Sequence, residues 1–95
     1  MNALFARALG AGVERAALLT FEQAMGMLEA RDGTSEVVRD NVSDEWVNLE
    51  IEPIQALRDF DGECIEMRIL VGDGHREVKT YFYVRPESGG VSAQK

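Results

Sequence analysis

The side chains that could perform catalysis or bind metal are few, and their spacing fits known sites poorly. Asp59, Asp61 and Glu63 alternate in the segment Asp-Phe-Asp-Gly-Glu, which resembles the start of a calcium-binding loop. The later oxygen ligands of such a loop are missing, so we interpret the segment as a turn. His75 and Cys64 are the only histidine and cysteine, and two ligands do not make a zinc site.

Cys64 would need a neighbouring base to act as a nucleophile. The β-hairpin that we predict below places His75 at the opposite end from Cys64. We therefore interpret Cys64 as a small apolar strand residue with a reduced thiol. From these residues we expect no catalytic site, no metal site and no cofactor, in a protein that is not an enzyme.

Three aromatic side chains, Trp46, Tyr81 and Tyr83, fall on the less apolar faces of predicted strands. Glu66 and Glu77 belong to the same faces. These five residues are the candidate partner-binding residues, because exposed aromatic groups dominate the energetics of many protein interfaces. In the alternative interpretation, a helix covers this face and makes the aromatic residues part of the core. We expect Tyr81 and Tyr83 to meet a partner and Trp46 to lie in the core.

A β-hairpin predicted over residues 63–85 positions most of these side chains, because apolar and polar residues alternate along both of its halves. A loop of Gly72–His75 would pair Ile69 with Val78 and place the two apolar faces together. A slip of one residue would turn one apolar face to water, so the register should be well defined. The predicted apolar face holds Ile65, Met67, Ile69, Val71, Val78, Thr80, Phe82 and Val84.

Two shorter segments upstream also read as strands. Residues 46–52 alternate cleanly, and Pro53 then ends this strand or places it at the edge of a sheet, because proline lacks a backbone N–H. Residues 36–39 form a short strand candidate around two valines.

The first third of the chain has helical periodicity. Residues 3–18 place apolar side chains at helical spacing, weakened by Gly10 and Gly12. Thr20 and Gln23 fit a capping box, which predicts a second helical segment that ends near a turn after Arg31. The sequence leaves open whether these segments form one long helix or a hinged pair.

The elements together predict an α+β fold with an N-terminal helix or helix pair packed on a small antiparallel β-sheet that has a long C-terminal hairpin. We expect one domain over residues 1–87 and a flexible tail over residues 88–95. The predicted core joins Ile65, Ile69 and Phe82 to the helical residues Phe21, Met25 and Leu28.

Composition narrows the classes of partner. The 95 residues contain 17 acidic and 10 basic side chains, with a formal net charge of −7. This excess of negative charge argues against direct binding of nucleic acid and permits a basic protein partner. The oligomeric state is left open by the sequence.

The cellular compartment can be inferred from the cysteine count and from the distribution of apolar residues. A single cysteine cannot form an internal disulfide, which suits a reducing compartment. No apolar run approaches the length of a membrane span, and Arg7, Glu14 and Arg15 interrupt any signal-like segment. We therefore expect a cytoplasmic protein from the sequence as given, or a cell-envelope protein if a signal sequence was removed.

Residues 46–90 resemble a known family. The matching features are Trp46, Pro53, a Gly62-Glu63-Cys64 strand, Glu66, a Gly72-Asp73-Gly74 turn, Tyr81, Arg85-Pro86-Glu87 and Gly89, preceded by an alanine-rich helix. In this order they resemble the C-terminal domain of the 17 kDa surface-antigen family, bacterial outer-membrane lipoproteins with a glycine-zipper segment. The resemblance covers about half of the chain and implies a structural or surface-associated module without a known reaction.

The chain also departs from that family's pattern. The family's second cysteine falls near Val84, so its disulfide cannot form here, and neither a lipobox nor an aromatic residue after Gly90 is present. The resemblance thus implies a fold more than a location.

Two functional hypotheses follow. The first is a non-enzymatic protein-interaction or structural module related to the surface-antigen domain. The alternative is a small acidic inhibitor or adaptor, of the kind encoded by phages and mobile elements, that docks on a basic protein surface. The net charge motivates the second hypothesis, and its binding should weaken steeply as salt rises.

Overall fold

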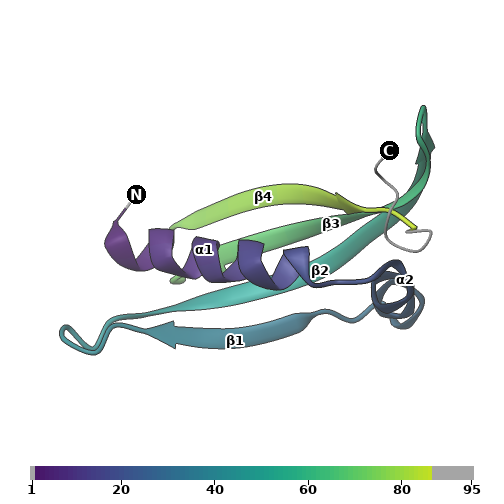
Figure 1. The fold of residues 1–95 in the computed structure, drawn as a ribbon. Coiled ribbons are helices and arrows are strands. Elements are labelled where there is room, and N and C mark those ends of the chain that lie inside the picture. The colour runs from purple at the N-terminus through teal and green to yellow at the C-terminus, as the bar shows by residue number, and fades with distance from the viewer. Residues whose placement is uncertain (1, 87–95) are drawn as a thin grey trace.

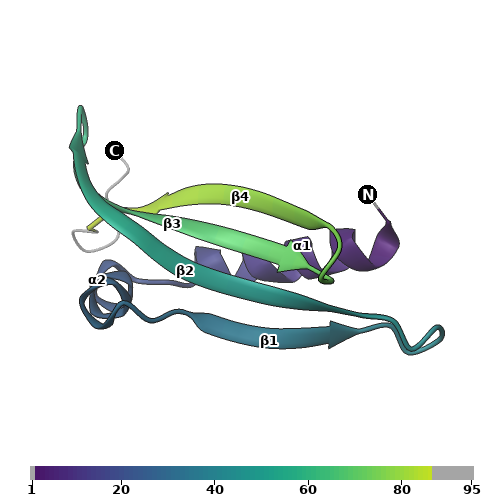
Figure 2. The same ribbon diagram turned by 180° about the vertical axis from the view of Figure 1, so that it is seen from behind.

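The computed structural model describes residues 2–86, which form two helices followed by four strands. The strands pair antiparallel in the order in which they occur, β1-β2-β3-β4. Figures 1 and 2 show both helices on one face of this sheet, so the fold has two layers. The predicted α+β class, with a helix pair on an antiparallel sheet, is confirmed. The predicted tail at residues 88–95 lies outside the described residues.

The two helices are separate and individually capped. Helix α1 spans Ala3–Ala17, and the side chain of Asn2 accepts a hydrogen bond from the Phe5 N–H at 2.8 Å. Helix α2 spans Phe21–Ala30 and begins with the predicted capping box, in which Thr20 and Gln23 exchange hydrogen bonds of 2.9 and 3.1 Å. The sequence left one helix or two open, and the structure has two.

Gly12 allows α1 to lie close to the sheet. A Cβ atom added there would stand 2.8 Å from Ile69 Cγ2 and 2.9 Å from Leu49 Cδ1, whereas one added at Gly10 would meet nothing within 4 Å. Gly12 therefore makes room for the sheet. Ile69 lies under α1, whereas the sequence prediction placed it against the residues of α2.

The first two strands are longer than the sequence indicated. Strand β1 spans Thr34–Arg39, β2 Trp46–Asp59, β3 Gly62–Gly72 and β4 Glu77–Val84. Pro53 does not end β2, because the ladder to β3 continues through an irregularity between Pro53 and Gln55. Strand β1 pairs with β2 only as far as Ile51, so Pro53 lies beyond the end of β1, where a missing N–H leaves no ladder bond unmade.

The predicted hairpin exists, but its register was wrong by two residues. Ile69 pairs with Thr80 rather than with Val78, because the connection is Asp73–Arg76. The Asp73 carboxylate fixes this turn by accepting hydrogen bonds from the N–H groups of His75 and Arg76 at 2.8 and 2.9 Å. A shift of two residues keeps every side chain on its predicted face.

The core lies between the helices and the sheet face that they cover. Ile65 and Ile69 are buried as predicted, whereas Phe82 on the edge strand β4 is only half-buried. Among the described residues no polar or charged side chain is buried. The buried cluster consists of Leu4, Phe5, Ala8, Ala24, Val47, Leu49, Ile51, Ile65, Met67, Ile69, Val71 and Val84.

Candidate protein-binding face

The sheet face opposite the helices carries the candidate site, and we call it the open face. Its residues alternate with the buried or half-buried residues of the helix-covered face along each strand. Neither helix lies on it in either view of the fold (Figures 1 and 2). By register it holds Ser35, Val37 and Arg39 of β1, Trp46, Asn48, Glu50, Glu52 and Gln55 of β2, Glu66, Arg68 and Leu70 of β3, and Glu77, Lys79, Tyr81 and Tyr83 of β4.

All five predicted partner-binding residues lie on the open face, and its aromatic side chains are well exposed. Tyr81, Tyr83 and Trp46 have exposed fractions of 47%, 51% and 44%. The expectation that Trp46 belongs to the core is wrong, because its neighbour Val47 takes the helix side and strand alternation turns Trp46 to the uncovered side.

The structure does not bring the three aromatic residues together. Tyr81 belongs to the cross-strand row of Glu52 and Arg68, which lies six residues along β2 from Trp46. At about 3.3 Å per residue, that separation is roughly 20 Å. Glu77 also lies away from the tyrosines, near the start of β4 with Lys79 4.0 Å away. Trp46 and Glu77 are therefore not part of the same local site as Tyr81 and Tyr83.

Two adjacent cross-strand rows make up the local site, which we call the tyrosine cluster. One row is Glu52–Arg68–Tyr81 and the other is Gln55–Glu66–Tyr83. Register alone brings these six side chains together, and the three that the sequence did not single out as candidates are Glu52, Gln55 and Arg68. Finding them required the length of the β3–β4 turn and the irregularity after Pro53.

Hydrogen bonds hold the polar side chains of the tyrosine cluster in place. Arg68 donates to Glu52 Oε2 from Nε at 2.9 Å and from a terminal guanidinium nitrogen at 2.5 Å. Glu66 accepts from the Gln55 amide at 2.8 Å and from the Tyr83 hydroxyl at 3.5 Å. The contact with Glu52 raises the pKa of Arg68 above its ordinary value. These side chains lose little further freedom when a partner binds.

The charges of the cluster leave one carboxylate without a basic counterpart inside it. Arg68 neutralises Glu52, whereas the donors to Glu66 are a neutral amide and a phenol. A carboxylate beside tyrosine rings suits a cation, and a guanidinium can stack on a ring while it donates to the carboxylate.

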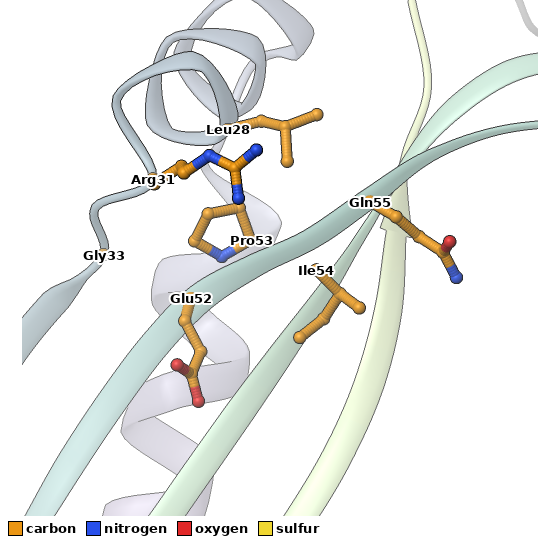
Figure 3. A pocket seen from close by; sticks show the side chains of 7 residues that line it. All are labelled: Leu28, Arg31, Gly33, Glu52, Pro53, Ile54 and Gln55. Atoms are coloured by element: carbon orange, nitrogen blue, oxygen red, sulfur yellow. The ribbon is translucent and has the colours of Figure 1, made fainter.

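A shallow cleft borders this face at the end of α2, with a volume of about 470 Å³. In Figure 3 Leu28 and Arg31 reach over Pro53 from α2, whereas the ends of Glu52 and Gln55 point away from Arg31. The Glu52 carboxylate is already bound by Arg68. The cleft therefore brings no pair of titratable groups into contact that would suit acid–base chemistry.

Cys64 and His75, the cysteine and the histidine considered above for catalysis or metal binding, are not part of the tyrosine cluster. Cys64 is 1% exposed and lies opposite Leu57 of β2. His75 lies in the β3–β4 connection. Within the described part of the chain, no three His, Cys, Asp or Glu side chains gather to hold a metal ion. In the same residues, no helix has the length and apolar character needed to cross a membrane.

The segment Asp59–Gly62, interpreted from the sequence as a turn, joins β2 to β3. Arg85 donates to both Asp59 carboxylate oxygens at 2.9 and 2.6 Å, and these bonds lower the pKa of Asp59 from 3.8 to about 2. Phe60 at the tip is fully exposed, outside the open face.

The chain was compared with known protein families, with curated proteins and with solved structures, and none of the three comparisons gave a match.

Proposed function

We propose that this protein is a non-enzymatic protein-interaction module that binds a partner through the tyrosine cluster. The observation that carries the proposal is the pair of half-exposed tyrosines on a sheet face that neither helix covers. Tyrosines are rigid and amphipathic, so they gain contact area at low cost in conformational entropy. A relationship to the surface-antigen domain belongs to the same proposal and rests on the matching motifs of residues 46–90.

The partner that fits this site presents an arginine on a basic surface. Glu66 supplies the carboxylate, and Tyr81 and Tyr83 supply ring faces beside it. The formal net charge of −7 adds long-range attraction for a basic protein. We expect no direct contact with nucleic acid, because phosphates would be repelled by the same charge.

A differential capture experiment tests this proposal. Immobilised wild-type protein, the double variant Tyr81→Ser/Tyr83→Ser and the control Phe60→Ser are exposed to the same extract of the source cells. The control removes a fully exposed aromatic side chain outside the open face. A protein retained by wild type and by the control but lost with the double variant supports the proposal. Equal retention by all three variants contradicts it.

The second candidate function is an acidic inhibitor or adaptor bound mainly by long-range charge. It is favoured by the formal net charge of −7. The six ion pairs among the described residues leave this charge unchanged, because each joins one acid to one base. Repeating the capture at low and high salt separates the two functions. Binding lost at high salt but indifferent to the tyrosines supports the inhibitor, because salt screens exposed charges.

A further inference from the structure

Strand β4 is a free edge of the sheet. It pairs with β3 on one side, and no described segment pairs with its other side. The helices lie against the two central strands, so the outer side of β4 is bare in both views (Figures 1 and 2). An exposed edge of eight residues is a template for pairing with another strand.

The backbone groups that face this free edge can be identified from the turn. The Asp73 N–H donates to the Arg76 carbonyl at 3.2 Å, so these two residues form a hydrogen-bonded antiparallel pair. Such pairs alternate along a ladder. The even-numbered residues of β4 therefore bond to β3, and the odd-numbered residues from Glu77 to Tyr83 direct their N–H and C=O groups outward.

The side chains of β4 are complementary to a second copy of the same strand. Suppose that two β4 strands run antiparallel, with Tyr81 of one chain opposite Tyr81 of the other. Glu77 of each chain then lies opposite Arg85 of the other chain, and Lys79 lies opposite Tyr83. The first pair joins opposite charges, with Glu77 approaching a guanidinium that also binds Asp59 of its own chain. The second pair places an ammonium beside a tyrosine ring. Lysine in an edge strand normally discourages pairing, and in this register it has a favourable neighbour.

The helix-side residues of β4 support the same register. Val78 would meet Val84, and Thr80 would meet Phe82, whose side chain is only half-buried in the single chain. A register centred on Lys79 would instead place the Lys79 side chains of the two copies opposite each other. One centred on Phe82 would oppose Lys79 to Arg85, and like charges directly opposite each other destabilise a sheet.

We propose that the protein forms a symmetric dimer in which β4 pairs antiparallel with β4 of a second copy, with Tyr81 at the two-fold axis. The interface is isologous and closes on itself, as in most homodimers. It joins the two sheets into one of eight strands and sets the two tyrosine clusters side by side on a continuous open face. This inference goes beyond the proposed function and does not depend on it.

Site-directed disulfide formation tests the register directly. Residues opposite each other at a hydrogen-bonded pair have Cα atoms about 5.5 Å apart, within the range that a disulfide can bridge. Tyr81→Cys should therefore give a covalent dimer rapidly under mild oxidation. Lys79→Cys is the matched control on the same face of the same strand. In the proposed dimer the two cysteines at position 79 would be offset by four residues, or roughly 13 Å along the strands. Wild-type protein controls for Cys64, which is buried.

Sedimentation equilibrium over a range of protein concentrations gives the second readout. Tyr81→Pro removes an N–H that faces the free edge and should shift the protein to monomer. Val37→Pro makes the same change at an outward-facing position of the other edge strand, β1, and should leave the dimer intact. A melting curve on each variant checks that it folds. A monomeric wild type, or equal disulfide formation by Tyr81→Cys and Lys79→Cys, would overturn the proposal.

Discussion

The close approach of α1 to the sheet gives a sharp prediction at two glycines two residues apart. Both Gly10→Ala and Gly12→Ala remove a residue that weakens a helix interior, and each should gain up to about 1 kcal/mol from helix propensity alone. At Gly10 the new methyl group meets nothing within 4 Å, so this gain should appear as higher stability.

At Gly12 the same methyl group collides with the core. Its Cβ would stand 2.8 Å from Ile69 Cγ2 and 2.9 Å from Leu49 Cδ1, and both side chains are almost fully buried. The branched Cβ of Ile69 restricts its rotation, so α1 must shift outward. Overpacking of this kind costs about 1–3 kcal/mol, and Gly12→Ala should be less stable than Gly10→Ala by that amount.

Thermal unfolding followed by circular dichroism measures this difference. For a domain of this size, about 1 kcal/mol corresponds to roughly 4–8 °C in Tm, so the two variants should be readily separated. If Gly12→Ala were as stable as Gly10→Ala, the reasoning would be refuted, because α1 would not then rest on Ile69 and Leu49.

Three further predictions concern the ion pair of Arg85 with Asp59, the one cysteine and the one tryptophan. Arg85→Gln should lower stability at neutral pH, because it removes the contact that depresses the pKa of Asp59. The difference from wild type should vanish as pH falls from about 4 towards 2, since the contact stabilises the fold only while the Asp59 carboxylate is ionised. Urea titrations across this pH range measure the difference. Cys64 should react slowly with a thiol reagent in the native protein and rapidly in denaturant, since it is 1% exposed; fast native labelling would show that the strand opens. Trp46, the only tryptophan, should be readily quenched by acrylamide in the native state, whereas strong protection would place another segment over the open face.

Local patterns in the sequence predicted most of the fold. The capping box at Thr20 and Gln23 located the start of α2, because its hydrogen bonds are made within one turn. The alternation of apolar residues assigned Ile65 and Ile69 to the covered face. Both signals depend on neighbours in the sequence, so they required no knowledge of the tertiary structure.

The register and the composition of the site could not be obtained in the same way. Asp73 rather than Gly72 begins the β3–β4 connection, and this choice moves the hairpin pairing by two residues. The ladder irregularity after Pro53 then decides that Gln55 lies opposite Glu66. Each feature acts across strands, and the alternation pattern is the same for either register.

The expectation for Trp46 failed for a different physical reason. A large aromatic residue is usually buried, but strand alternation leaves Trp46 only one side of the sheet once Val47 is in the core. The sequence does not state that both helices cover the same face, and that arrangement leaves the open face bare (Figure 2).

Photo-crosslinking from the tyrosine cluster tests the proposed function most directly. The photoreactive analogue p-benzoylphenylalanine would replace Tyr83 in one protein and Phe60 in a matched control, since both side chains are aromatic and exposed. We predict an adduct between position 83 and a different, basic protein, suppressed by unlabelled wild type but not by Tyr81→Ser/Tyr83→Ser. An adduct that forms equally from position 60, or no adduct from position 83, would contradict the assignment of the tyrosine cluster as a protein-binding site.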